Sequence, residues 1–360
     1  MMTLEELREK IDKVDDEILE LLNKRMEYVS EVGDIKNTLE SAIFRPEREH
    51  SIINRLTALS KKKDGILDRK AIEAIFYEII GVAKNLERTE RVAYLGPKGT
   101  FTHQAAQMRF GSLKDYIPLA SISSVFKAID SDRAAYGVVP IENSTDGIVG
   151  ETLDLLGEYD LKILAEIYMP IHHSFCSLSS SLEEITKVYS KDIAFGQCRK
   201  FLNEHGLDSV ELIPVESTAK AAEMAKDEAK SAAICPHIAA KLNKLPIMFD
   251  NIEDMHDNKT RFIIIGKFPS IPSGNDKTSI LAKLSNEPGS LVEFLREFEK
   301  KNINLTKIES RPAKEDKAFS YWFFIDFEGH KDEPKISRLF KKNKYDIKWL
   351  GSYVKVEDEI

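Results

Sequence analysis

The first ninety residues carry a long apolar stripe, and this stripe constrains the fold more than any other feature of the chain. Apolar residues recur every three or four positions, in a stretch that contains no proline and one glycine, Gly33. The stripe consists of Leu4, Leu7, Ile11, Val14, Ile18, Leu21, Tyr28, Val32 and Ile35. One helix of this length, on the order of 50 Å at 1.5 Å per residue, cannot bury the stripe alone. The pattern predicts an all-α domain over residues 1–90, with partner helices near 46–60 and 68–87.

Basic residues lie close to this stripe. Arg25 stands where the heptad requires an apolar residue, and Lys36 lies close to three whole turns further on, so both face the same way. A charge in a helix seam is costly unless it is paired. Two interpretations stay open: a buried salt bridge that fixes helix register, or an anion pocket inside a helical bundle. Arg8 is about 26 Å along the helix from Arg25. Arg8 therefore serves the same pocket only if it comes from a second chain, in an intertwined dimer.

Composition narrows the function classes. The 360 residues allow two or three domains, and the net charge of −8 with interspersed signs argues against a nucleic-acid surface. The three cysteines, Cys176, Cys198 and Cys235, form neither a close pair nor a metal-type spacing. The start of the chain lacks an apolar signal core, and no window approaches the ~20 apolar residues of a membrane span. We therefore expect a cytoplasmic protein without a membrane, nucleic-acid, metal or cofactor partner.

From about residue 91 to residue 270, short apolar runs alternate with helical patterns. This alternation predicts an α/β domain whose functional residues lie at strand ends. The predicted strands are 92–95, 137–141, 161–167, 210–215, 232–235 and 262–265, and the predicted helices are 101–110, 151–158, 195–205 and 218–226.

Thr260 and Arg261 lie at the mouth of the last of these strands. Phe262 to Ile265 is a continuous apolar run, typical of a fully buried strand. A Thr hydroxyl at its start can protonate a leaving group, and an Arg can clamp a carboxylate with two parallel hydrogen bonds. The alternative is a β-favouring Thr beside an Arg whose head reaches solvent.

The last ninety residues follow a Pro/Gly-rich linker at 269–275. Their predicted order of elements, βαββαβ over residues 276–360, indicates an α+β, ferredoxin-like unit.

Four segments of the helical domain, 7–11, 21–25, 32–36 and 46–49, resemble the all-helical chorismate mutases. The resemblance implies that Arg8 of a partner chain, Arg25 and Arg48 bind the two carboxylates of chorismate. It also implies that Lys36 and Glu87 flank the breaking ether bond and that Glu49 holds the substrate hydroxyl.

Three positions depart from that family. Ala83 stands where relatives often have Ser, and Arg45 where bifunctional enzymes can carry an acid, which leaves open whether the mutase pocket is fully active. Glu87 stands where many relatives have Gln. A carboxylate there repels negative charge developing on the ether oxygen, so we expect Glu87 to work protonated and mutase activity to fall as pH rises.

Six segments of the middle domain, 94–103, 139–144, 189–190, 197–198, 216–218 and 260–262, resemble the prephenate dehydratases. The resemblance implies two α/β lobes around a cleft, like type-2 periplasmic binding proteins. It implies that Thr260 donates a proton to the departing C4 hydroxyl of prephenate, with Arg261 supporting it. The substrate-binding residues would be Thr100, Asn143, Ser190 and Gln197, with Glu142 and Glu216 near the cleft.

Two segments of the last domain resemble the ACT regulatory domains of dehydratases. They are Gly289-Ser290-Leu291-Val292 and Glu309-Ser310-Arg311-Pro312. The resemblance implies that L-phenylalanine binds here between two subunits, with helix N-terminal amides facing its carboxylate. A purely structural dimerisation sheet is the alternative.

Together the resemblances imply a multidomain, bifunctional enzyme of phenylalanine biosynthesis. It would rearrange chorismate to prephenate, convert prephenate to phenylpyruvate, respond to L-phenylalanine by feedback inhibition, and form a homodimer or higher homo-oligomer. Three alternatives stay open: an inactive mutase domain, a dehydratase that prefers arogenate, and a non-catalytic amino-acid sensor.

Overall fold

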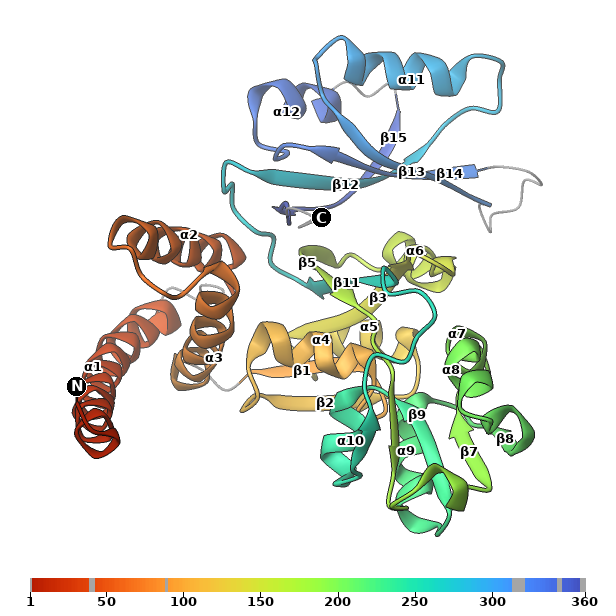
Figure 1. Cartoon of the computed structure of the whole chain (residues 1–360). Coiled ribbons are helices and arrows are strands. Elements are labelled where there is room, and N and C mark those ends of the chain that lie inside the picture. The colour runs from red at the N-terminus through yellow and green to blue at the C-terminus, as the bar shows by residue number, and fades with distance from the viewer. Residues whose placement is uncertain (1, 39–42, 88–89, 313–320, 342–344, 357–360) are drawn as a thin grey trace. The chain divides into compact units, whose positions relative to one another are not determined.

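The computed structural model describes residues 2–38, 43–87, 90–312, 321–341 and 345–356 (Figure 1). It divides into two compact units, one built mainly from the first ninety residues and one that holds most of the remaining chain. Three helices make up most of the first unit: α1 (Leu4–Thr38), α2 (Pro46–Lys62) and α3 (Arg69–Glu87). These spans agree with the predicted helices to within a few residues. Residues 46–50 of α2 group with the second unit.

Helix α1 begins with a capping box. The Thr3 hydroxyl accepts a hydrogen bond from the backbone N–H of Glu6, and the Glu6 carboxylate accepts one from the N–H of Thr3. Near its other end α1 lies close to α3, because a Cβ on Gly33 would stand 3.0 Å from the Cα of Glu87.

The apolar stripe of α1 is exposed along most of its length. Leu4, Ile11 and Leu21 keep 65%, 59% and 66% of their surface accessible within this chain. Exposed apolar surface of this extent along one helix is typical of a face that packs against another chain.

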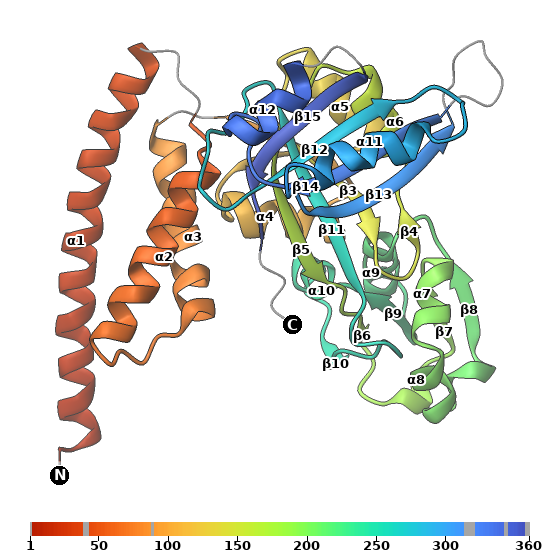
Figure 2. The ribbon, with the colours of Figure 1, turned by 90° about the horizontal axis from the view of Figure 1, so that it is seen from above.

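The two-lobed domain that follows contains two sheets (Figures 1 and 2). The first sheet has the order β2-β1-β3-β11-β5, with β4 paired to β3, and the second has the order β10-β6-β9-β7-β8. The strands of the first sheet are β1 (Arg91–Leu95), β2 (Asp115–Leu119), β3 (Tyr136–Asn143), β4 (Gly147–Ile148), β5 (Lys162–Pro170) and β11 (Lys259–Gly266). Those of the second are β6 (Ser174–Ser177), β7 (Lys187–Ser190), β8 (Glu211–Pro214), β9 (Ser231–Cys235) and β10 (Ile247–Phe249).

Helices connect and cover these strands. The α-helices are α4 (Phe101–Phe110), α5 (Ile122–Asp130), α6 (Gly150–Glu158), α7 (Asp192–Gln197), α8 (Arg199–Glu204), α9 (Thr218–Asp227) and α10 (His237–Asn243). The predicted helix 195–205 is divided, because Cys198 leaves helical geometry at φ −117° and ψ 25°. The alternation did not predict β2, α5, β4, β6, β7, α10 or β10.

The chain crosses between the two lobes twice, at residues 171–173 and 250–258. These two crossings lie side by side, because the N–H of Ile171 donates to the carbonyl of Asn258 at 2.8 Å and that of Ile252 to the carbonyl of His173 at 2.9 Å. The second crossing leads directly into β11, the strand that lies between β3 and β5 and runs antiparallel to both. Thr260 is therefore held where the lobes join.

The last domain is a four-stranded antiparallel sheet with two helices on one face (Figure 1). Its elements are β12 (Asp276–Lys283), α11 (Ser290–Glu299), β13 (Leu305–Pro312), β14 (Tyr321–Glu328), α12 (Pro334–Lys341) and β15 (Asp346–Val354). This is the predicted βαββαβ order, with the strands arranged β13-β14-β12-β15.

The sheet of the last domain shares a hydrophobic core with the first lobe. Leu281, Phe324 and Leu350 belong to the same buried cluster as Leu156 and Ile263. Strands β15 and β5 approach closely, since a Cβ on Gly351 would lie 2.2 Å from the carbonyl oxygen of Ile163. These two domains are therefore packed as one body.

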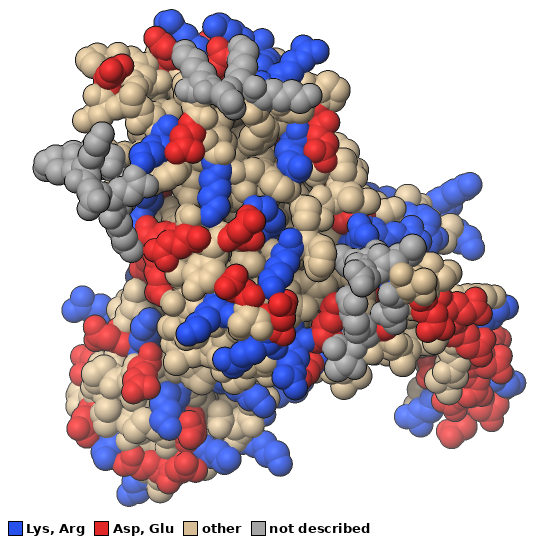
Figure 3. Space-filling view, turned by 180° about the vertical axis from the view of Figure 1, so that it is seen from behind, with Lys and Arg blue, Asp and Glu red and all other residues tan. Residues whose placement is uncertain are grey.

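Basic and acidic side chains intermix over most of the face shown in Figure 3, and acidic side chains predominate at its lower right. No helix among the described residues has the length and apolar character to cross a membrane. In the same part of the chain no group of three or more His, Cys, Asp or Glu side chains is arranged to hold a metal ion.

Candidate active sites

Strand β11 presents Thr260 and Arg261 to opposite faces of its sheet, as neighbouring strand residues must. Thr260 is paired with Asn143 on β3, and Arg261 is paired with Glu142. Residues paired across adjacent strands share a face. The first lobe therefore has one face with Thr260 and Asn143 and another with Arg261 and Glu142.

Asn143 holds the Thr260 hydroxyl in one hydrogen-bonding role. Its side-chain oxygen accepts from the backbone N–H groups of Thr145 and Asp146, both at 2.9 Å. Backbone N–H groups only donate, so this contact fixes which end of the amide is oxygen. The amide nitrogen then donates to the Thr260 oxygen at 2.8 Å and to the Asn258 side-chain oxygen at 2.8 Å.

This arrangement leaves the Thr260 proton available. The hydroxyl oxygen accepts from Asn143, and no described residue accepts a hydrogen bond from the hydroxyl. Thr260 is 8% exposed, so its oxygen is fixed by protein groups rather than by bulk solvent. A hydroxyl held in this way is a positioned hydrogen-bond donor for a ligand at the lobe junction.

The other predicted dehydratase residues are distributed around both lobes. Thr100 caps α4, because its oxygen accepts from the N–H of His103 at 3.3 Å. Ser190 is fully buried and donates to the carbonyl of Ile234 at 2.7 Å. Glu216 is exposed beyond the end of β8. The structure thus brings Thr260 and Asn143 together, and it engages Thr100 and Ser190 in local contacts.

Gln197 makes a contact that the sequence did not predict. Its side-chain oxygen lies 3.0 Å from Nε2 of His173, which is 2% exposed and packs edge-on against the Phe101 ring at 5.5 Å. Burial is the largest effect on this imidazole and lowers the pKa of His173 below its usual value, against a smaller opposing effect of Gln197. The contact between this ring and Gln197 orients the Gln197 amide. Strand β5 ends at Pro170, so His173 lies beyond the strand and does not follow its alternation of faces.

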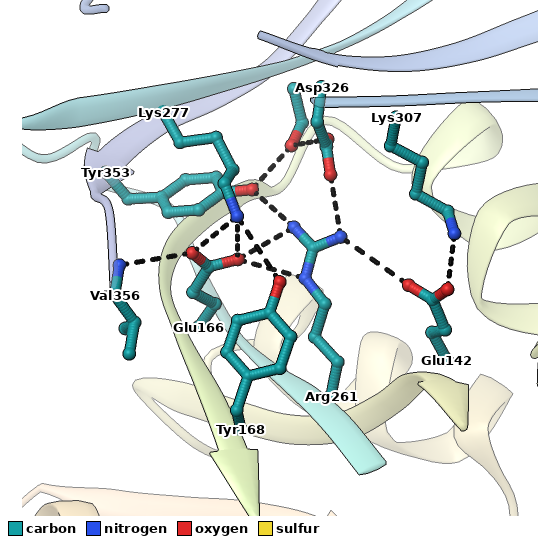
Figure 4. A network of polar contacts seen from close by, with 10 residues as sticks. Glu142, Glu166, Tyr168, Arg261, Lys277, Lys307, Asp326, Tyr353 and Val356 are labelled. Atoms are coloured by element: carbon teal, nitrogen blue, oxygen red, sulfur yellow. Dashed lines mark hydrogen bonds and ion pairs between the residues drawn. The ribbon is translucent and has the colours of Figure 1, made fainter. Parts of the chain in front are cut away.

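Arg261 does not lie beside Thr260, contrary to the expectation of a paired hydroxyl and guanidinium. It is 3% exposed and points towards the last domain (Figure 4). Its Nη1 donates to Asp326 at 2.6 Å, its Nε to Glu166 at 2.9 Å and its Nη2 to the hydroxyl of Tyr353 at 2.9 Å.

The buried network contains two positive and two negative side chains, and their surroundings shift the pKa values of Arg261 and Tyr353. Burial is the largest effect and lowers the pKa of Arg261. Asp326, Tyr353 and Glu166 outweigh it, so that the pKa lies well above its usual value. Burial first, and then Asp326, raises the pKa of the Tyr353 hydroxyl. Arg261 remains a cation and Tyr353 a neutral phenol.

Glu142 was expected near the cleft, and the structure places it on the Arg261 face. Its carboxylate forms an ion pair with Lys307 on β13 and lies 4.0 Å from Nη1 of Arg261 (Figure 4). The reason is the two-residue period of β3, which turns Glu142 away when Asn143 faces the junction.

In the helical unit, the side chains of Lys36 and Glu87 contact each other. The resemblance to the chorismate mutases assigns both to one site. The Lys36 ammonium lies 2.6 Å from the Glu87 carboxylate, and the two side chains are 23% and 11% exposed. The contact places an ammonium beside the carboxylate of Glu87, as that resemblance implies. Arg25 is half-buried on the same helix as Lys36, and Arg8 is exposed about 26 Å away along it.

Helix α2 carries the two other mutase candidates near its start. Arg48 is exposed and Glu49 is 3% exposed. Arg45, one of the atypical residues, directly precedes this helix, and Ala83 on α3 is 4% exposed.

Three consecutive parts of the chain match known protein families. Residues 7–88 match the type II chorismate mutases, residues 92–270 the prephenate dehydratases and residues 278–344 the ACT domains. A bifunctional chorismate mutase/prephenate dehydratase of Aquifex aeolicus (strain VF5) is 46% identical over 359 residues, covering 99% of each chain.

The chain belongs to the bifunctional chorismate mutase/prephenate dehydratases. It is accordingly an isomerase and a lyase, with chorismate and prephenate as substrates.

Two solved structures are similar to the dehydratase and ACT domains. The prephenate dehydratase of Arthrobacter aurescens, in complex with L-Phe, is 30% identical with a TM-score of 0.67, over 74% of this chain and 90% of that one. A protein described as a novel type of quorum quenching acylase is 26% identical with the same TM-score, over 74% of this chain and 98% of that one. Similar folds can carry different functions, so the likeness in fold does not by itself determine the reaction.

The predicted effector residues of the ACT domain lie at a helix start and on an edge strand. Gly289 adopts φ +91° directly before α11, and the Ser290 hydroxyl donates to the carbonyl of Glu287 at 2.9 Å. Leu291 and Val292 follow in the first turn of α11, with Val292 53% exposed.

The second effector motif ends β13, and part of it faces the dehydratase domain. Glu309 is half-buried and Ser310 is exposed. Arg311 forms an ion pair with Asp154 of α6 at 3.2 Å. Arg311 and Pro312 also border a cavity of about 210 Å³ between α6 and the ACT sheet. The motif therefore reaches the dehydratase domain as well as solvent.

A second cavity of about 320 Å³ lies beside the lobe junction. Its lining consists of Phe101, Gln104, Met108, Met169, Pro170, His172, His237, Asp250 and Asn251. None of the predicted dehydratase residues lines it, but Met169 is the residue that β5 pairs with Thr260.

Proposed function

We propose that Thr260 is the acid of the dehydratase reaction and that Asn143 keeps its proton directed at the substrate. The observation that carries this proposal is the one-way hydrogen bond from the Asn143 amide to the Thr260 oxygen at 2.8 Å. A hydroxyl that already accepts from the protein has its own hydrogen left to donate.

The reaction balances with this single donor. The C–C bond to the ring carboxylate of prephenate breaks, and its electron pair enters the ring as carbon dioxide leaves. The C4–O bond then breaks with its electrons on oxygen, and the departing hydroxide takes a hydrogen bond and a proton to leave as water. Thr260 supplies that proton in concert with bond breaking and regains it from solvent. Aromatisation supplies the driving force, so the protein needs to align the groups and assist the leaving oxygen.

The two lobes frame this chemistry as in type-2 periplasmic binding proteins. The side-by-side crossings at 171–173 and 250–258 support this proposal, because they form a two-stranded hinge next to Thr260. Around the substrate, Thr100, Ser190, Gln197 and Glu216 would contribute further contacts from both lobes.

We infer from the resemblance to the chorismate mutases that Arg25, Lys36, Arg48, Glu49 and Glu87 bind chorismate, with Arg8 donated by a partner chain. The exposed apolar stripe of α1 supports a second copy as its occupant, because one chain leaves that stripe uncovered. The rearrangement needs only positioned charges that hold the reactive conformer and stabilise the ether oxygen.

We further infer that L-phenylalanine inhibits the enzyme by binding the ferredoxin-like ACT domain. The residues concerned are Gly289, Ser290, Leu291, Val292, Glu309, Ser310, Arg311 and Pro312. The Arthrobacter aurescens relative, solved with L-Phe, supports this assignment.

Separate assays on the full chain test the proposal. The wild-type protein should form prephenate from chorismate and phenylpyruvate from prephenate, and added L-phenylalanine should lower the second rate. Faster turnover of arogenate than of prephenate would reassign the substrate. If the protein bound phenylalanine but converted neither substrate, it would be an amino-acid sensor and not an enzyme. If only the conversion of chorismate were missing, the mutase domain would be inactive.

A further inference from the structure

A buried ion network joins the dehydratase sheet to the ACT sheet (Figure 4). Arg261 and Lys277 supply two cations, and Glu166 and Asp326 supply two anions. All four residues are at most 5% exposed. If one of these side chains moved away, its partner would be left as an unpaired charge without contact to solvent, which is energetically costly. The network therefore holds its members in place.

Asp326 is the ACT residue at the centre of this network. Its Oδ2 accepts from Arg261, and its Oδ1 accepts from the Ser279 hydroxyl. The Ser279 proton is thereby used, so Tyr353 must donate its proton to the Ser279 oxygen at 2.7 Å, and the Tyr353 oxygen accepts from Arg261. Each hydrogen bond in this series has one direction. The Asp326 carboxylate fixes the direction of the Ser279 hydroxyl, and Ser279 in turn fixes that of Tyr353.

The network lies one peptide away from both members of the proposed catalytic pair. Arg261 follows Thr260 on β11, and Glu142 precedes Asn143 on β3. Arg261 is bound to Asp326 on β14, and Glu142 is bound to Lys307 on β13. The two strands that carry the hydroxyl and its amide donor are therefore each attached to the ACT sheet at the adjacent residue.

We propose that Asp326 is a positioning residue for the dehydratase reaction, acting through Arg261 to hold Thr260 in register with Asn143. This inference rests on the proposed role of Thr260. A displacement of about 1 Å at a reacting group can cost on the order of 10²-fold in rate. The ACT sheet thus sets the geometry of a site that its own residues do not touch, and Arg261 serves as the link between them.

The experiment compares Asp326→Asn with a matched control, Glu328→Gln, in the full chain without phenylalanine. Glu328 lies two residues along the same strand and pairs with Lys355, with both side chains about one-third exposed. We expect Asp326→Asn to lower kcat for prephenate by roughly 5- to 50-fold with KM within about threefold, because a misplaced donor affects the transition state more than substrate binding. Glu328→Gln should keep wild-type kcat, and both variants should keep mutase activity.

A purely structural role predicts a different result. Asp326→Asn would then melt at a lower temperature but turn over prephenate at the wild-type rate below its melting point, which would overturn the proposal. If Asp326→Asn does not fold, Ser279→Ala decides, because it removes one hydrogen bond to Asp326 without unpairing a charge. Ser279→Ala should lower kcat with KM unchanged, and wild-type kcat would refute the positioning role. Full dehydratase activity in Thr260→Val would instead refute the proposed acid, whatever the Asp326 variant does.

Discussion

The two faces of the first dehydratase sheet differ in the kind of contact they contain. On one face, Thr260 and Asn143 form a neutral hydrogen bond that leaves one proton unused. On the other face, Arg261 is enclosed by carboxylates and a phenol, with each of its nitrogens engaged. Neighbouring residues of one strand therefore differ in their contacts: Arg261 attaches the ACT domain, and Thr260 keeps the proton to which we assign the chemistry.

The energetics of the two faces differ in the same way. Removing a neutral hydrogen bond from a folded protein costs about 1 kcal/mol of stability. Removing one partner of a buried ion pair costs about 3–5 kcal/mol, because the other charge stays buried. Substitutions on the Thr260 face should therefore remove activity and keep the fold, and substitutions on the Arg261 face should weaken the fold as well.

The largest expected effect is that of Thr260→Val on turnover of prephenate. Valine keeps the shape of threonine but has no proton to donate, so kcat should fall by about 10²- to 10⁴-fold. Mutase activity should stay at the wild-type level, and Thr260→Ser should recover part of the dehydratase rate. Normal phenylpyruvate formation by Thr260→Val would show that Thr260 is not the acid of the reaction.

Arg261→Met should destabilise the dehydratase and ACT body by about 3–5 kcal/mol, because Glu166 and Asp326 would remain buried with only one cation, Lys277. Urea unfolding of the full chain, followed by a probe in this body, measures the change. If Arg261→Met instead abolished dehydratase activity while keeping wild-type stability, the guanidinium would act in the cleft after all.

Asn143→Asp sharpens the account of the Thr260 face. An ionised carboxylate only accepts hydrogen bonds, so it would draw the Thr260 proton towards itself and away from the substrate. We expect kcat to fall by roughly 10- to 100-fold, at least as much as in Asn143→Ala. A more active Asn143→Asp than Asn143→Ala would show that the direction of this hydrogen bond does not matter.

A smaller effect concerns His173 and the pH dependence of stability. Burial lowers the pKa of His173 in the folded protein below the ordinary value of 6.5. Between these two pKa values the unfolded chain binds a proton at this residue and the folded chain does not. This contribution is present above about pH 6.5 and is lost as pH falls through the lower folded-state pKa. His173→Gln should therefore flatten the decline in melting temperature between about pH 7 and pH 6. An unchanged slope would remove His173 as its cause.

The smallest expected effect is that of Glu142→Gln. Glu142 faces Lys307 and not the lobe junction, and both side chains are partly exposed, so their pair holds β3 less firmly than the buried Arg261–Asp326 pair holds β11. We therefore expect kcat for prephenate to stay within about threefold of wild type. A loss as large as that of Thr260→Val would restore Glu142 to the cleft, where the sequence had placed it.

The sequence predicted the elements better than the directions of their side chains. The span of α1 and the βαββαβ order of the last domain follow from local patterns, and the structure contains both. Strand β11 was predicted from its apolar run. That run is continuous because the strand is buried on both faces, so it carries no alternation to show which face Thr260 or Arg261 occupies.

The sequence also could not predict which residues contact Arg261. Glu166 and Asp326 are 95 and 65 residues away in sequence and come from two other domain segments. Only the packing of the ACT sheet on the first lobe brings them together. Asn258, by contrast, lies just before Thr260, and its contact with Asn143 could be recognised only once β3 and β11 were paired.

The most direct test is a crystal structure of the full chain with a non-reactive prephenate analogue that keeps the C4 hydroxyl. The account predicts the Thr260 oxygen within about 3 Å of that hydroxyl, with the guanidinium of Arg261 still bound to Asp326. An analogue whose carboxylate is clamped by Arg261, with Thr260 turned away from the C4 oxygen, would contradict it.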